Sequence, residues 1–258
     1  MILDRRRYGT DNYTYFLAEG EDAALVDPGD PVVALGMAAA HGVRPRWILH
    51  THGHPDHTGG SAAIRERLGA RVLGHGADAG RFAPDEDLTG RGELALGALR
   101  IRVHEAPGHT PGSVLFEAGG ALLTGDTLFW GGTGNCRSGG DPHLLARTFL
   151  TVFPALDARL LVHPGHDYAE ANLPFVLALE PGNEAARARL ATARAARAAG
   201  AEPAPSTLAE ERAVNPFLRS GAPEVRDAVL RRAGSQAATP EAVFVALRAL
   251  RDRGLAAG

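Results

Sequence analysis

The stretch Thr51-His52-Gly53-His54-Pro55-Asp56-His57 brings three imidazoles and one carboxylate together between His52 and His57. It follows an apolar run at 47–49, which predicts a short buried strand, and precedes a segment at 58–68 with helical composition. Histidines at alternate strand positions, or in the loop that leaves the strand, can converge on one cation. A solvated histidine-rich loop is the alternative, but imidazole together with carboxylate favours a metal site.

Three later segments add one polar side chain each, next to the end of a predicted strand. They contribute His109 between glycines and prolines, Asp126 beside a glycine, and His166 after the last predicted strand. Ligands on loops at strand ends are common in functional sites, because the strands hold the loops rigidly. Imidazole and carboxylate suit zinc, iron, manganese or cobalt, and a closed cysteine-type zinc site is excluded.

The composition narrows the chemistry further. Among the 258 residues there is one cysteine, Cys136, and no lysine, so an intrachain disulfide and a lysine Schiff base are both excluded. A formal net charge of −3 gives no general attraction to nucleic acid. The chain starts without an apolar leader, and no apolar run approaches membrane-spanning length. We expect a cytoplasmic protein with no nucleic-acid or membrane partner.

The predicted elements divide the chain into two parts. Up to about residue 168, short strands alternate with helices, and from 169 to 258 the sequence is mainly helical. A segment at 200–206 with two prolines is predicted to be a linker. We therefore expect a layered α/β catalytic domain over 1–168 and a helical C-terminal region over 169–258.

Taken in order, these motifs resemble the metallo-β-lactamase superfamily. The family pattern His-x-His-x-Asp-His, a downstream His, an Asp and a final His has its counterparts in His52, His54, Asp56, His57, His109, Asp126 and His166. The resemblance implies an αββα sandwich with a helical C-terminal extension here. It also implies that His52, His54 and His109 hold one metal, that Asp56, His57 and His166 hold another, and that Asp126 bridges them.

Such a pair of cations implies hydrolytic chemistry. We expect two divalent metal ions, zinc as the first choice and iron or manganese as alternatives. A water held between two cations has a lowered pKa and can attack a carbonyl that one of them polarises. Asp56 is placed to orient that nucleophile, so Asp56 and Asp126 are the predicted catalytic residues. Cys136 is expected to be an ordinary thiol.

A second resemblance concerns the substrate. The segments 166–173, 180–183 and 215–219 resemble the hydroxyacylglutathione hydrolases (glyoxalase II). The closing helix carries Arg248 and Arg251, similar to the basic pair that holds the glutathione carboxylate in that family, and Tyr168 would add a hydroxyl contact. This resemblance implies a thioesterase that cleaves 2-hydroxyacyl adducts of glutathione or a similar small thiol.

Two departures from that family stand out. Gly53 replaces a family histidine that is not a ligand, so the metal set is unaffected. In the loop 132–140, Asn135 and Arg137 stand where the family has its basic and tyrosine thiol-binding residues. Arg137 can still bind a carboxylate, but another low-molecular-weight thiol is an open alternative.

Other functions compete with the thioesterase. A persulfide dioxygenase would use one iron held by His52, His109 and Asp126. A lactonase or phosphodiesterase of the same superfamily would use the same ligands, whereas an inactive metal-binding module would be expected to lack one. We expect a small-molecule thioester as the substrate, and a monomer or homodimer.

Overall fold

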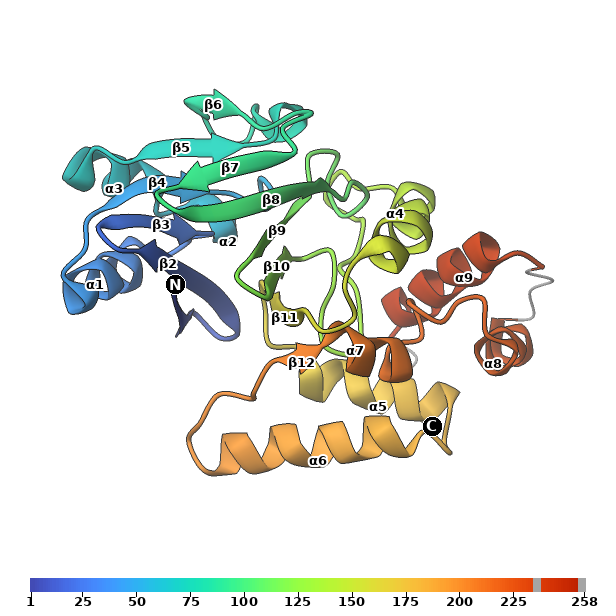
Figure 1. Cartoon of the computed structure of the whole chain (residues 1–258). Helices are drawn as coiled ribbons and strands as arrows, with labels where there is room; N and C mark the ends of the chain where they lie inside the picture. The colour runs from blue at the N-terminus through green and yellow to red at the C-terminus, as the bar shows by residue number, and fades with distance from the viewer. Residues whose placement is uncertain (234–237, 255–258) are drawn as a thin grey trace.

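A computed structural model describes residues 1–233 and 238–254 of the chain (Figure 1). Within these residues, two six-stranded sheets carry the fold, in the orders β1-β2-β3-β4-β5-β6 and β12-β11-β10-β9-β8-β7. The first sheet contains β1 (Ile2–Tyr8), β2 (Asn12–Glu19), β3 (Asp22–Val26), β4 (Pro45–Leu49), β5 (Arg71–Gly74) and β6 (Glu86–Asp87). The second contains β7 (Glu93–Leu96), β8 (Leu99–Glu105), β9 (Val114–Ala118), β10 (Ala121–Gly125), β11 (Leu161–Pro164) and β12 (Ser206–Thr207).

Both sheets mix antiparallel hairpins with parallel pairs, and the parallel pairs decide where the loops lie. β3 pairs with β4 and β4 with β5 in parallel, and β10 pairs with β11 in parallel. The carboxyl ends of parallel strands meet at one edge of a sheet. The loops that follow β3, β4, β10 and β11 are therefore brought to common edges.

Alternation along β2 explains how the layers separate. Tyr15 and Leu17 belong to a large buried cluster with the second sheet, whereas Phe16 and Ala18 belong to a smaller cluster with α1 and α3. Successive side chains of a strand point to opposite faces, so one strand contributes to both cores. The predicted layered sandwich with a helical extension is confirmed.

Helices cover the sheets and form the C-terminal part (Figure 1). They are α1 (Pro31–His41), α2 (Pro55–Thr58), α3 (Ser61–Leu68), the 3-10 turn η1 (Gly76–Asp78), α4 (Pro142–Ala155), α5 (Ala169–Leu179), α6 (Glu184–Ala198), α7 (Leu208–Val214), α8 (Pro223–Ala233) and α9 (Pro240–Asp252). Asp30 caps α1 by accepting from Val32 N and Val33 N, and Thr239 caps α9, as its position before Pro240 predicts. Across the described residues, no helix has the length and apolarity needed to cross a membrane.

The C-terminal helices are packed onto the sandwich. α9 contacts α4 and α8, and α5 contacts α6. Leu173, Phe217 and Phe244 of this part belong to the same buried cluster as the inner faces of both sheets. The predicted linker at 200–206 ends in β12, which adds an antiparallel edge strand to β11. The helical part therefore shares the hydrophobic core of the sheets.

Several elements differ from the sequence expectation. β1 was not predicted, because its Arg5-Arg6-Arg7 run hides the strand pattern, yet it pairs with β2 along its whole length. The helix expected over 58–68 is split into α2 and α3 at Gly59–Gly60, since Gly60 N donates to Pro28 O at 3.0 Å. α7 was also missed, although its Thr207 forms a capping box with Glu210.

Candidate metal centre

The seven predicted ligands converge although they come from four separate segments of the chain. The β4–α2 segment contributes His52, His54, Asp56 and His57, the β8–β9 loop contributes His109, and the turns after β10 and β11 contribute Asp126 and His166. His54 starts α2 as its N-cap, and Pro55 occupies the first helical position. Ligands on both sides of Pro55 thus reach the two neighbouring clusters.

One cluster contains three histidines and Asp126. One ligand atom from each of His52, His54, His109 and Asp126 lies within 4.8 Å of the others. The Nδ1 atom of His54 is 3.1 Å from His52 Nε2 and 3.0 Å from His109 Nε2. His52 and His109 are buried and His54 is half-buried, so this group opens to solvent on the His54 side.

A second cluster lies beside the first. Ligand atoms of Asp56, His57 and His166 lie within 4.8 Å of one another, with 3.1 Å between the Nε2 atoms of His57 and His166. Asp126 lies between the two clusters: Oδ1 is 3.3 Å from His57 Nε2, and Oδ2 is 3.4 Å from His166 Nε2 and 3.6 Å from His109 Nε2.

The donor set fits a pair of cations. Asp126 Oδ1 is buried and, among the described residues, has no hydrogen-bond partner. Several imidazole nitrogens face one another at about hydrogen-bond distance, although a neutral imidazole carries a single N–H. Cations placed among these lone pairs would satisfy them all. The cluster of histidines and carboxylates therefore suits a binuclear metal site.

The electrostatics of the clusters differ. Burial lowers the pKa of His52 and His109, so both imidazoles are neutral at pH 7. Burial also opposes the charged forms of Asp126 and His57, but the attraction of His166 and His57 for Asp126, and of Asp126 for His57, outweighs it. The pKa of Asp126 is held well below the usual range of an aspartate, and the pKa of His57 is raised well above the usual range of a histidine. Asp126 is thus an anion in the centre of the site.

Asp27, at the end of β3, orients the second cluster. Its Oδ2 is 3.2 Å from His57 Nδ1, and its carboxylate accepts from Thr51 N at 2.8 Å and Thr51 Oγ1 at 2.5 Å. Burial opposes its ionisation, but the neighbouring imidazoles of His50 and His57 hold the pKa of Asp27 well below its usual range. A carboxylate on the outer nitrogen fixes the ring and its tautomer.

Sequence reasoning missed two residues of the β1–β2 turn. Asp11 Oδ1 is 2.7 Å from His166 Nδ1, and Asn12 Nδ2 donates to Asp56 Oδ2 at 3.0 Å. This turn reaches the second sheet, where Tyr13 N donates to Gly165 O at 2.8 Å. No local pattern identifies these residues, because their role depends on a contact between the two sheets.

Asn135 contacts the first cluster through its main chain. The Asn135 carbonyl is 2.6 Å from His109 Nδ1, while its side-chain oxygen accepts from Arg137 N at 2.9 Å. The exposed Arg137 guanidinium donates to Asp252 O at 2.6 Å. Tyr168 stacks on the ring of His166, with centroids 4.8 Å apart and 7° between the planes. Tyr168 therefore contacts a ligand through its side chain, whereas Asn135 does so through its main chain.

The two arginines of α9 point into the protein. Arg248 is 6% exposed, and its Nη1 donates to Thr133 O at 2.8 Å while its Nη2 pairs with Asp252 at 2.8 Å. Arg251 Nη2 donates to Ala171 O at 3.1 Å. Both guanidinium groups thus have main-chain partners, and the Arg248 partner belongs to the loop that follows Asp126.

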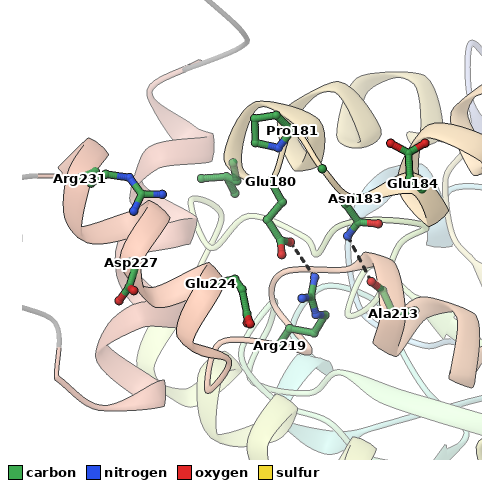
Figure 2. Close-up of a pocket in the computed structure, with 11 residues that line it drawn as sticks. Glu180, Pro181, Asn183, Glu184, Ala213, Arg219, Glu224, Asp227 and Arg231 are labelled. Carbon is green, nitrogen blue, oxygen red and sulfur yellow. Dashed lines mark hydrogen bonds and ion pairs between the residues drawn. The ribbon is translucent and has the colours of Figure 1, made fainter.

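The helical part also contains a cavity of about 650 Å³, remote from the ligands (Figure 2). It lies where α5, α6, α7 and α8 meet. Figure 2 shows that its charges are partly neutralised internally, since Arg219 Nη1 lies 2.7 Å from Glu180 Oε2. Asn183 Nδ2 donates to Ala213 O at 3.2 Å across the same wall. Part of the charge and polarity of this wall is therefore already paired within the protein.

Comparison with known protein families accounts for nearly the whole chain. Residues 7–169 match the model of the metallo-β-lactamase superfamily, and residues 167–254 match that of the hydroxyacylglutathione hydrolase C-terminus. Among solved structures, ETHE1 from Myxococcus xanthus is similar with a TM-score of 0.68 and 25% identity, covering 98% of this chain and 100% of that one. TTHA1623, solved in a di-iron-bound form, gives a TM-score of 0.60 and 27% identity, over 83% of this chain and 100% of that one.

A curated relative extends the match along the full sequence. The hydroxyacylglutathione hydrolase of Anaeromyxobacter dehalogenans (strain 2CP-C) is 70% identical over 254 residues, which is 98% of this chain and 100% of the relative. Both family models and this identity agree with the ligand clusters described above. The chain is a metal-dependent hydrolase of the metallo-β-lactamase superfamily and belongs, within it, to the hydroxyacylglutathione hydrolases.

Proposed function

We propose that this enzyme hydrolyses thioesters between a 2-hydroxy acid and glutathione, or a closely similar small thiol. The observation that carries the proposal is the position of Asp126 between two complete ligand clusters, in a chain 70% identical to a hydroxyacylglutathione hydrolase. A hydrolase of this kind needs no nucleophilic serine or cysteine. Burial also raises the pKa of Cys136 to about 11, which makes its thiol a poor nucleophile at pH 7.

The proposed ligand sets follow the two clusters. His52, His54 and His109 would hold one cation, Asp56, His57 and His166 would hold the other, and Asp126 would serve both. Zinc is our first choice, with iron or manganese as alternatives. Two bound cations would supply an acidified water and a Lewis acid for the thioester carbonyl.

The chain itself contributes orientation and proton transfer. The side chain of Asp56 is 49% exposed, so it lies where substrate and water have access. Asn12 donates to Asp56 Oδ2 at 3.0 Å, and Tyr8 Oη donates to the Asp56 carbonyl at 2.5 Å. These bonds hold the carboxylate in place, and its Oδ1 is the atom we assign to accept the proton of the attacking water.

We assign the thiol carrier to the side of the site that opens at His54 and Asp56. Tyr168 stacks on His166, the loop that contains Asn135 and Arg137 contacts His109 and His54, and Arg251 donates to Ala171 O. Arg248 is buried, whereas Arg137 is exposed and Arg251 is half-buried, which favours a different role for Arg248. We propose that Arg248 holds the loop at Thr133, and that Arg137 and Arg251 provide the positive charge for the substrate carboxylates.

The same reasoning assigns different functions to the two parts of the chain. We propose that residues 1–168 form the catalytic part and that 169–258 form the substrate-binding part; 234–237 and 255–258 of that range lie outside the described residues. We assign the enzyme to the cytoplasm, because the lone Cys136 needs no oxidising compartment. Both a monomer and a homodimer are compatible with this proposal.

Persulfide oxidation with a single iron at His52, His109 and Asp126 is the second candidate function. The full-length similarity to the ETHE1 fold keeps this candidate open. Against it stand His54, Asp56, His57 and His166, which a single-iron site would not need.

The test is metal analysis together with turnover of S-lactoylglutathione and glutathione persulfide by one preparation. We expect two cations per chain and thioester hydrolysis. One iron per chain, with oxygen consumed on the persulfide and no thioester cleavage, would overturn the proposal.

A further inference from the structure

Asp78, the last residue of η1, is a buried carboxylate outside both proposed ligand sets. It is 2% exposed. Its Oδ2 accepts from Gly53 N at 2.8 Å and from Thr110 Oγ1 at 2.6 Å, and its Oδ1 accepts from Gly112 N at 3.1 Å. Both oxygens of this buried carboxylate therefore have hydrogen-bond partners within the protein.

The partners of Asp78 belong to two loops that carry ligands. Gly53 lies between His52 and His54, in the loop after β4 of the first sheet. Thr110 follows His109, in the loop between β8 and β9 of the second sheet. One carboxylate therefore joins the two chain segments that together supply the three-histidine cluster.

The glycines at both contacts fit this arrangement. A Cβ atom at Gly53 would lie 3.0 Å from Asp78 Cβ and 2.8 Å from Arg81 Cδ. A Cβ atom at Gly112 would lie 2.8 Å from Asp78 Cγ. Any larger residue would push the carboxylate away from one loop or the other. This close approach gives a physical reason for Gly53, the position at which the chain departs from the histidine run of its family.

We propose that Asp78 is a positioning residue that sets the spacing between His54 and His109, and thereby the affinity of the three-histidine cluster for its cation. The inference rests on the ligand sets proposed above. Asp78 acts through main-chain N–H groups and the Thr110 hydroxyl, without touching an imidazole.

The second cluster is held by different carboxylates. Asp11 and Asp27 contact the outer nitrogens of His166 and His57 directly, at 2.7 and 3.2 Å. Asp78 thus contacts the loops of the three-histidine cluster and Asp11 contacts a ligand of the other cluster, whereas Asp27 also reaches His52 through Thr51. Changing an outer partner typically costs about 10–100-fold in metal affinity. A change at Asp78 should therefore weaken one cation, and a change at Asp11 should weaken the other.

The test compares Asp78→Asn with Asp11→Asn and with Asp157→Asn, an exposed residue whose carboxylate binds Arg159. Zinc and cobalt affinities are measured on the metal-free, full-length protein by competition with a chelator, and the cobalt absorption spectrum is recorded. For Asp78→Asn we expect the affinity of one of the two cation sites to fall about 10–100-fold, for zinc and for cobalt alike. Asp11→Asn should weaken the other cation, the double variant should weaken both, and Asp157→Asn should change neither.

Several outcomes would overturn the inference. They are unchanged affinities in Asp78→Asn, an equal loss of both cations, or loss of the same cation in Asp78→Asn and Asp11→Asn. If Asp78→Asn does not fold without metal, Thr110→Val removes one of the three hydrogen bonds and should weaken the same cation by a smaller factor. A wild-type chain that binds one cation would instead refute the proposed function, which keeps the two failures distinct.

Discussion

The metal centre and the C-terminal helix α9 use their charged side chains in opposite ways. At the metal centre, short histidine and aspartate side chains on strand-end loops point toward one another, and outer carboxylates such as Asp27 fix their rings. On α9, the longer side chains of Arg248 and Arg251 turn inward to main-chain carbonyls. A short side chain near a rigid strand end can reach few partners. A long arginine side chain can reach either the substrate or a main-chain carbonyl of the protein.

Removal of Asp126 should have the largest effect. Asp126→Ala leaves both clusters without their common anion, so we expect loss of metal together with loss of activity. The loss should be well beyond the roughly 10–100-fold that follows removal of an outer partner. Metal analysis and thioester turnover on one sample check this. Full activity in Asp126→Ala would show that the two clusters do not share a carboxylate.

Arg248 and Arg251 test the helical side of the comparison. Arg248→Ala leaves buried carbonyls and Asp252 without a donor, so we expect a loss of about 2–4 kcal/mol in the free energy of unfolding. The melting temperature should fall by roughly 5–15 °C. Arg251→Ala should mainly raise KM, with a smaller effect on stability. A stable Arg248→Ala enzyme with a raised KM would show instead that Arg248 binds the substrate.

The buried His163 on β11 predicts a dependence of protein stability on pH. Burial, and then the nearby Arg5, lower its pKa to about 4, and among the described residues neither ring nitrogen has a hydrogen-bond partner. As pH falls from 6.5 to 4, the unfolded chain gains a proton that the folded chain refuses, so stability falls, by roughly 3 kcal/mol at most. His163→Phe keeps the edge-on contact with Tyr15 and removes this loss. Denaturant unfolding of both proteins at pH 7 and pH 4.5 measures it, and an equal loss in both would contradict the assignment.

The smallest effect is expected at Asn135. Its carbonyl, which any residue provides, contacts His109, whereas its side chain accepts from Arg137 N. Asn135→Ala should therefore keep both metals and cost about 1 kcal/mol of stability or less. A large rise in KM without any loss of stability would show that the Asn135 side chain contacts the substrate.

The same contrast explains what could be predicted from the sequence. His52, His54 and His57 lie within one short stretch, and His109, Asp126 and His166 each follow a recognisable strand, so the resemblance to the metallo-β-lactamase superfamily could assign them to one site. The roles of Asp11 and Asp78 could not be predicted, because each residue contacts a ligand-bearing segment that is distant in the sequence. The inward turn of Arg248 was equally hidden, since the sequence shows a charged helix face and not the carbonyls beneath it.

The layered fold was predictable for a related reason. Alternation along β2 and the apolar run of β4 record which faces are buried. The strand β1 could not be predicted in this way, because Arg5 packs its guanidinium over the Tyr13 ring, 4.5 Å from its centroid, instead of facing solvent. A charged residue that stacks on an aromatic side chain looks like a surface residue in the sequence.

Anomalous diffraction from zinc-loaded crystals tests the central claim most directly. We predict two zinc peaks on either side of Asp126, roughly 3.5–4 Å apart as in other two-metal sites. One peak should lie among His52, His54 and His109, and the other among Asp56, His57 and His166. A single peak at His52, His109 and Asp126, with none near His166 at saturating zinc, would contradict it.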